Sequence, residues 1–235
     1  MLARWLAVVG IILVLAVAGY VFVTKSSRNA VPNFSNSNLS SECTPKFTHH
    51  FTDIAIIDSI VPPIFRNSKG IMPTMLINIT GRAPLYMPAN GKLVQGSYHN
   101  EEGAQFYMWE IDIGCNVTVV FDHVTEPMEK VKRLFPSAPR DDSQTDFFET
   151  PLEMAAGELV GYTTGSVNAH NWNFAVYNAS EKNYLWETGE FSDRPKYYTQ
   201  VCPFKYYDRS MAQDYEKLFT LSLRDLSVEK NLCED

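Results

Sequence analysis

The sequence predicts a mainly β domain that is preceded by one N-terminal transmembrane helix. Apolar and polar residues alternate along most of the chain, and turn residues punctuate the alternation. Aromatic residues reach 13%, which favours strands and a bulky core. The remaining composition is that of a globular chain, with 45% hydrophobic and 20% charged residues. A net charge of −7 and the lack of a basic block argue against a nucleic-acid partner.

The transmembrane helix is predicted from the stretch between Trp5 and Val23, which carries no charge and almost no polarity. About 20 apolar residues at about 1.5 Å each span a hydrocarbon core of about 30 Å. A cleaved signal peptide is the alternative, because Ala16-Val17-Ala18 fits the small-residue cleavage pattern. Since the apolar run continues past that pattern, we expect a retained anchor over residues 1–24, contacting the membrane through residues 5–23.

Residues 25–42 are rich in Ser and Asn and are expected to form a flexible stalk. The positive charges on either side of the anchor are nearly balanced, so they do not fix its orientation. Five glycosylation sequons, which are also compatible with chance, begin at Asn33, Asn38, Asn78, Asn116 and Asn178. With the stalk, they favour a single-pass protein of the cell membrane with most of the chain extracytoplasmic.

The four cysteines are consistent with an extracytoplasmic, oxidising compartment, where disulfides form. None forms a Cys-x-x-Cys pair, so a zinc knuckle or a redox dithiol is not expected. Two disulfides would allow three pairings. Joining Cys202 with Cys233 would close the C-terminal segment and leave Cys43 with Cys115. Buried free thiols are the alternative.

The domain itself is expected over residues 43–207 as strands separated by turns. The expected strands are 53–57, 75–79, 92–98, 105–113, 117–124, 158–163 and 171–177. Trp109 and Ile111 face one side of their strand and Glu110 the other. Gly114-Cys115-Asn116 is expected to join two of the strands as a hairpin turn.

Helices are expected only at the periphery. Thr125–Phe135 can form a short helix, and residues 208–235 are expected as a C-terminal helical segment with an amphipathic helix at about 210–223. Residues 136–150 are expected as a solvated loop. The aspartates of that loop lack the alternating ligands and the glycine that a calcium loop needs.

Two glycine turns carry a family resemblance. Pro88-Ala-Asn-Gly-Lys-Leu-Val94 and Met154-Ala-Ala-Gly-Glu-Leu-Val-Gly161 each place a glycine, which permits a tight reversal, just before a strand. These phrases resemble the barrel-sandwich, or duplicated hybrid, motif of lipoyl-type carriers and of M23-type (lysostaphin-like) peptidases. A carrier would need a modified lysine in a hairpin, and none occurs at that place. The chain is therefore more similar to the M23-type family, over about residues 43–207.

The resemblance extends to the family's site. Phe121-Asp-His-Val124 resembles the family strand that ends in His, and Asn171-Trp-Asn-Phe174 takes the place of the strand with His-x-His-Phe. The family holds zinc with two His and one Asp. Here Gly70–Leu76 resembles the upstream family segment but has neither His nor Asp, and an amide is a poor zinc ligand. The resemblance thus implies no metal, no catalytic set and one retained family position, His123.

The binding-groove candidates that follow from this resemblance are His123, Asn171, Trp172 and Asn173. Other histidines could form a rearranged metal site only through tertiary folding: His49, His50, His99 and His170. A Cys115–His123 nucleophile pair is disfavoured under oxidising conditions. Glu110 and Asp112 could form a carboxylate pair, but the solvated face of a strand is the favoured interpretation.

These observations predict an M23-like domain at the cell envelope that has lost peptidase activity, needs no cofactor and serves in binding or assembly. Its partner would be a glycan, a peptide or an envelope protein. Trp109, Trp172 and Trp186 could stack on sugars, although core packing is the favoured interpretation for each. The first alternative is an active zinc metallopeptidase of the envelope with rearranged ligands. The second is an assembly factor that binds nothing in its groove.

Overall fold

The structure is a computed structural model that describes residues 43–223 and 226–234. The mainly β prediction is confirmed, since strands dominate the described ranges and helices are short. The expected anchor and stalk, residues 1–42, lie outside these ranges. Within them, no helix combines the length and apolar character needed to cross a membrane.

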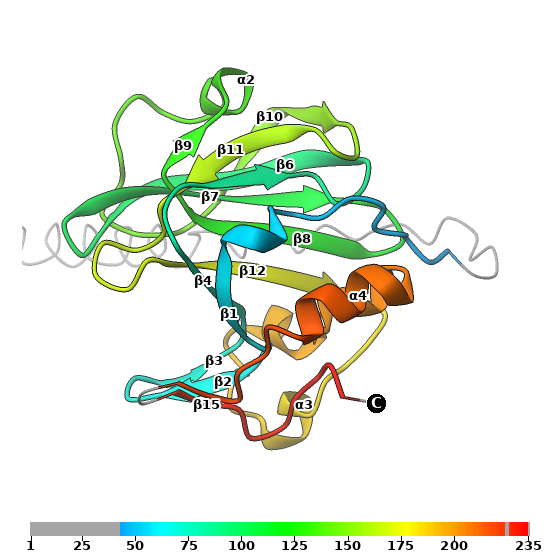
Figure 1. The fold of residues 1–235 in the computed structure, drawn as a ribbon. Coiled ribbons are helices and arrows are strands. Elements are labelled where there is room, and N and C mark those ends of the chain that lie inside the picture. The colour runs from blue at the N-terminus through cyan, green and yellow to red at the C-terminus, as the bar shows by residue number, and fades with distance from the viewer. Residues whose placement is uncertain (1–42, 224–225, 235) are drawn as a thin grey trace, which may run out of the picture. The chain divides into compact units, whose positions relative to one another are not determined.

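One large antiparallel sheet forms the centre of the domain (Figure 1). Its strand order is β1-β4-β12-β8-β7-β6-β10, and the short β13 pairs with β12. The strands are β1 (Ile57–Val61), β4 (Met75–Ile79), β6 (Gly91–Glu101), β7 (Ala104–Asp112), β8 (Val117–Val124), β10 (Asp146–Met154), β12 (Asn171–Asn178) and β13 (Gln200–Val201).

Two small sheets flank the central one, one above it and one below it in the view of Figure 1. The upper sheet has the order β5-β11-β9 and contains β5 (Ala83–Tyr86), β9 (Glu126–Pro127) and β11 (Leu159–Thr163). The lower sheet has the order β14-β15-β2-β3 and contains β2 (Phe65–Asn67), β3 (Gly70–Met72), β14 (Ser222–Leu223) and β15 (Leu226–Ser227). The main core lies between the central and upper sheets, because Leu85 and Val160 pack there with Trp109.

The helices are peripheral, as expected. They are η1 (Ile54–Ile56), α2 (Glu129–Lys132), α3 (Leu185–Thr188), η2 (Pro195–Thr199), η3 (Pro203–Tyr206) and α4 (Arg209–Glu216). The C-terminal segment nevertheless belongs to the same body as the rest of the domain, because Tyr215 of α4 is fully buried in the main core.

Several boundaries differ from the sequence prediction. Residues 54–56 form η1 in place of a strand, and pairing begins only at Ile57, opposite Ile79. The predicted loop ends early, because Asp146 already pairs with Gly96 and starts β10. The predicted C-terminal helix is shorter than expected and ends at Glu216, and short strands follow it.

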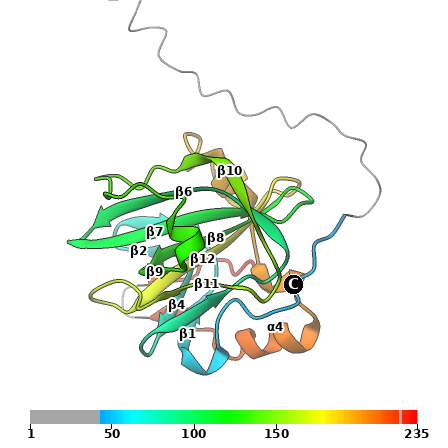
Figure 2. The same ribbon diagram turned by 90° about the horizontal axis from the view of Figure 1, so that it is seen from above.

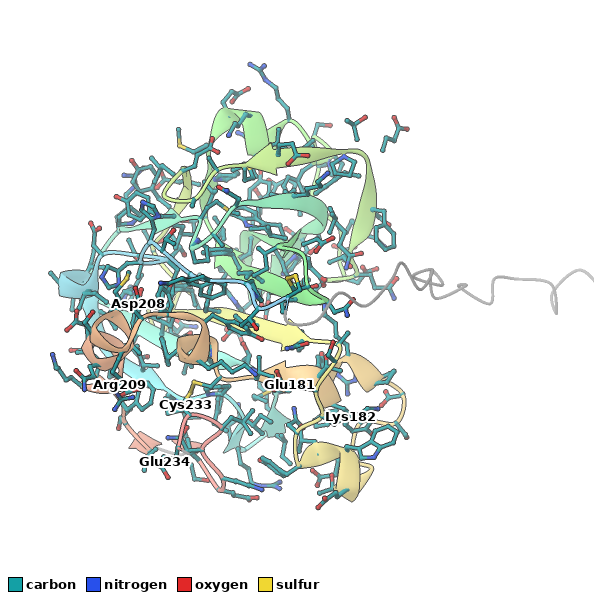
Figure 3. All side chains as sticks on the ribbon, turned by 90° about the vertical axis from the view of Figure 1, so that its right-hand side faces the viewer. Glu181, Lys182, Asp208, Arg209, Cys233 and Glu234 are labelled. Carbon is teal, nitrogen blue, oxygen red and sulfur yellow. A yellow bond between two sulfur atoms is a disulfide. The ribbon has the colours of Figure 1, made fainter. Side chains whose placement is uncertain are left out.

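The two disulfides pair as the sequence suggested. Cys43 is bonded to Cys115, with Cα atoms 5.4 Å apart, and Cys202 to Cys233, with Cα atoms 5.0 Å apart. Figure 3 labels Cys233 in the C-terminal segment near the start of α4. The alternative of free thiols is wrong, and Cys115 has no thiolate with which to act as a nucleophile.

The core is built from stacked aromatic rings. Trp172 is fully buried and lies parallel to Phe121, with ring centroids 5.9 Å apart. Trp109 is fully buried as well, whereas Trp186 is 54% exposed. Trp109 and Trp172 are therefore core residues, and neither offers a ring to a sugar.

We predict that Trp172→Ala lowers the free energy of unfolding by about 3–5 kcal/mol, because it leaves a large cavity in a packed core. Trp186→Ala, the matched change of an exposed tryptophan, should cost less than about 1 kcal/mol. Urea unfolding of the two variants and the wild type measures both values. Equal losses in the two variants would contradict the assignment of Trp172 to the core.

Candidate functional site

A cleft of about 550 Å³ lies on the face of the central sheet that turns away from the main core. Its base comes from β4, β8 and β12, and its walls come from the lower sheet and from the loop of residues 164–170. The apolar part of the lining comes from eight side chains: Phe65, Met72, Leu76, Ile79, Phe106, Val167, Ala169 and Leu226. The rest is polar, so the cleft can meet both an apolar surface and hydrogen-bonding groups.

The register of the sheet brings three of the four sequence candidates together. Asn173 of β12 pairs with Asp122 of β8, which places it beside His123. Asn171 lies opposite Asn78 of β4. His123, Asn171 and Asn173 all line the cleft.

Trp172 is the exception, and its assignment to the groove is wrong. Successive side chains of a strand point to opposite faces, so a residue between Asn171 and Asn173 must point away from the cleft. Trp172 accordingly lies in the core, with no exposed surface.

His123 adopts an unusual backbone conformation. Its φ is 61°, in the left-handed region that non-glycine residues rarely occupy, at a cost of order 1–3 kcal/mol. Its carbonyl oxygen accepts a hydrogen bond from the hydroxyl of Thr163. His170, at the rim of the same cleft, also has a positive φ of 51°. Local strain therefore gathers at this cleft, which is a common feature of functional sites.

Both ring nitrogens of His123 face carboxylates. The Nδ1 atom lies 3.4 Å from Oδ2 of Asp122, and the Nε2 atom lies 3.4 Å from Oε2 of Glu101. The ring also packs against Phe106, with centroids 5.0 Å apart. Glu101 stands at the end of β6, so its side chain spans the position of β7 to reach β8.

Glu101 contacts a second histidine. The Nε2 atom of His99, on the same strand, lies 3.6 Å from Oε2 of Glu101, too far for a hydrogen bond. His99 is 2% exposed, and its Nδ1 atom lies 3.0 Å from the hydroxyl of Ser97. Its Nε2 atom has no hydrogen-bond partner among the described residues. The carboxylate of Glu101 therefore lies between two imidazoles.

These contacts set the charge of the cluster. Burial disfavours the charged form of His123, but the charge of Asp122 and hydrogen bonds with Asp122 and Glu101 outweigh it and raise the pKa of His123 to about 10. The nearby imidazoles of His123 and then of His99 hold the pKa of Glu101 well below its ordinary value. Burial alone would raise the pKa of Asp122, yet His123 lowers it. At neutral pH His123 is therefore an imidazolium between two carboxylates.

The asparagines add neutral hydrogen-bonding groups. Asn78 donates to Ser59 with Nδ2···Oγ at 3.0 Å, and Oδ1 of Asn171 accepts from Ser166 at 2.9 Å. Asn173 donates from Nδ2 to Oδ2 of Asp122 at 3.3 Å. The Oδ1 atom of Asn173 is buried and has no partner among the described residues. Such an acceptor is costly to leave unpaired unless a ligand or water reaches it.

This donor set does not fit the zinc ion that the family resemblance would imply. A histidine must be neutral to ligate a metal, and both nitrogens of His123 are held by carboxylates. Asn171 and Asn173, where the resemblance would require a His-x-His pair, carry amides. In residues 43–223 and 226–234, no three His, Cys, Asp or Glu side chains are placed to hold a metal together.

The remaining sequence candidates lie outside the cluster. His50 contacts the hydroxyl of Tyr215 through Nδ1 at 3.1 Å, and His49 lies against Gly157. Glu110 pairs with Lys196, while Asp112 accepts from the backbone of its turn, so these two do not act as a carboxylate pair.

Sequence reasoning missed two members of the cluster, Glu101 and Asp122, and named His99 only as a histidine that tertiary folding could bring to a metal site. For Asp122 a signal was available, because it adjoins His123. For Glu101 there was none, because more than twenty residues and a whole strand separate it from His123.

Comparison with known proteins gives little further information. No family model matches the chain, and no curated protein matches it. One solved structure with detectable similarity is the NMR solution structure of lysostaphin, at 15% identity and a TM-score of 0.35. The match covers 60% of this chain and 46% of the lysostaphin chain. At this TM-score the similarity supports no statement about fold, activity or ligand.

The charge cluster predicts a pH-dependent stability. The raised pKa of His123 stabilises the fold fully below its ordinary value of 6.5, and this contribution is lost as the pH rises toward about 10. The lowered pKa of Glu101 stabilises the fold above the ordinary value of 4.5, and this contribution is lost below it. Between pH 6.5 and 9 we expect urea unfolding to show a loss on the order of 2 kcal/mol.

His123→Gln should remove most of the fall in unfolding free energy between pH 6.5 and 9. Glu101→Gln should reduce this fall and should also remove part of the loss of unfolding free energy at acid pH. Subtracting a variant's curve of unfolding free energy against pH from the wild-type curve removes the contributions of groups outside the cluster, such as His50. An alkaline slope that is identical in wild type and His123→Gln would contradict the ion-paired state of His123.

Proposed function

We propose that this chain is a membrane-anchored, extracytoplasmic M23-like domain that binds a partner in the cell envelope and does not hydrolyse it. The observation that carries the proposal is the ion-paired state of His123, whose two ring nitrogens face Asp122 and Glu101. The fold assignment itself rests on the sequence phrases that resemble the M23-type family. It is supported by the way the sheet gathers His123, Asn171 and Asn173 in one cleft.

Hydrolysis would require groups that this cleft lacks among the described residues. A general base must be unprotonated at the working pH, and a pKa of about 10 leaves His123 protonated. Amides neither accept a proton near neutral pH nor bind zinc well. The residues at the family's catalytic positions can therefore position a ligand but cannot activate water.

Binding is supported by the shape and chemistry of the cleft. Its volume of about 550 Å³ lies within the range of about 300–1,000 Å³ that is usual for ligand sites. The side chains of Asn78, Asn171 and Asn173 offer both donors and acceptors, and Oδ1 of Asn173 still has acceptor capacity. A peptide, a glycan or a segment of an envelope protein can satisfy such groups.

The proposed location has two supports. Both pairs of cysteines are closed as disulfides, which persist in oxidising compartments. The apolar stretch from Trp5 to Val23 is long enough to span a bilayer. Together they support a location outside the cytoplasm on a single N-terminal anchor.

The first test is metal content. We expect the purified chain, reconstituted with zinc and then desalted, to retain far less than one zinc per chain, and His123→Ala to behave as the wild type does. One zinc per chain that disappears in His123→Ala would overturn the proposal. That result would instead favour the active metallopeptidase with rearranged ligands.

The second test concerns binding. A photo-crosslinking residue placed at Asn171 should form adducts in intact cells, and Asn173→Ala in the same chain should reduce them several-fold, because it removes a hydrogen-bonding group from the cleft. The same crosslinker at the exposed Trp186 serves as the control. Adducts at Trp186 but none at Asn171 would support an assembly factor that leaves its cleft empty and would contradict the proposal.

A further inference from the structure

A second pocket, of about 440 Å³, lies where β10 separates from β6, and it shares no lining residue with the cleft. Figure 2 shows β10 alongside β6 at one edge of the central sheet. Phe147 pairs with Gln95 and Leu152 pairs with Leu93, so residues 148–151 of β10 lie opposite the single residue Val94. Phe148, Glu149 and Thr150 of this bulge line the pocket. Bulges at sheet edges often re-aim side chains toward a functional site.

A glycine shapes the base of the pocket. A Cβ atom on Gly96 would lie 2.7 Å from the ring of Phe135, so only glycine lets that ring approach β6. Phe148 meets Phe135 edge to face, with centroids 5.2 Å apart. Tyr98 stacks on Tyr107 at 4.2 Å, which fixes a ring at one wall. The pocket thus has a rigid aromatic base.

Phe147 stands apart from this packing. Its side chain is 71% exposed, which is the largest exposure among the exposed large hydrophobic residues of the described ranges. It lines the pocket all the same. An exposed ring at the mouth of an aromatic pocket offers a flat apolar face to a ligand.

The polar lining is balanced in charge. Arg140 donates from Nη1 to Asp146 at 2.7 Å, and Arg133 pairs with Glu129 at 3.1 Å. The charged residues that line the pocket are two arginines and two acids, namely Arg133, Arg140, Asp146 and Glu149. Both arginines are already paired with carboxylates, so the pocket offers an anionic ligand no unpaired cation among the described residues, which favours an uncharged ligand.

We propose that this pocket binds the pyranose rings of a neutral glycan. Phe147 stacks on the apolar face of a sugar ring, and the Arg140–Asp146 pair and Thr150 exchange hydrogen bonds with its hydroxyl groups. A purely apolar ligand would leave these polar groups desolvated and unpaired. An ionic ligand would have to break the existing ion pairs. The site is independent of the cleft and of what the cleft binds.

The test uses the full chain in a detergent without a sugar headgroup, titrated with chitohexaose and with cellohexaose by calorimetry. We expect saturable binding of at least one of them. Phe147→Ala should weaken it about tenfold, equivalent to about 1.4 kcal/mol of stacking. Trp186→Ala, which removes an exposed ring elsewhere, should leave the affinity within twofold. Raising NaCl from about 0.05 to about 0.5 M should also change it less than twofold, because the ligand is uncharged.

Phe147→Ala carries little risk of misfolding, because the ring it removes is mostly in solvent. Absence of saturable binding to both oligosaccharides would overturn the proposal. Binding that Phe147→Ala leaves unchanged would overturn it as well, and so would an affinity that falls steeply with salt.

Discussion

The cleft depends on one electrostatic constraint, the placement of the His123 imidazolium between Asp122 and Glu101. The three residues come from two strands that are not neighbours, β8 and β6, and the ring of Phe106 on the intervening strand packs against His123. Removing one partner would leave a partly buried charge unpaired, which costs more than the pair itself contributes. The cluster therefore fixes the charge of the site.

This constraint also decides what the cleft can offer to a ligand. The charges of Glu101, Asp122 and His123 contact one another within the protein. The cleft also presents amides and apolar side chains, together with the charged residues Asp58, Lys69 and Glu102. Such an array suits recognition, in which donors and acceptors are matched one by one. Activation of water requires a free base or a metal. The amide side chains of Asn171 and Asn173 and the contacts of His123 with two carboxylates thus favour the same functional proposal.

Local patterns in the sequence were sufficient for much of the fold. The strand at Met75–Ile79 and the hairpin at Gly114–Asn116 were predicted, because alternation and turn residues are local signals. The cysteine count predicted two disulfides but left three pairings open, and the structure contains the pairing that the sequence analysis suggested. Trp172 was assigned to the cleft face of its strand, although the alternation of successive side chains between the two faces already excluded it from the face of Asn171 and Asn173. The partnership of Glu101 with His123 could not be predicted, since it arises from strand order and hairpin length. The early start of β10 was missed for the same reason: its pairing with Gly96 is a tertiary contact.

The most direct measurement is an NMR titration of the His123 ring nitrogens, assigned with His123→Gln and followed from about pH 5 to about pH 10. The ion-paired state predicts that both nitrogens keep the chemical shifts of an imidazolium through neutral pH and begin to titrate only near pH 10. A midpoint near the ordinary value of 6.5, with one nitrogen becoming an acceptor at neutral pH, would contradict it. His123 would then be free to serve as a base or a metal ligand.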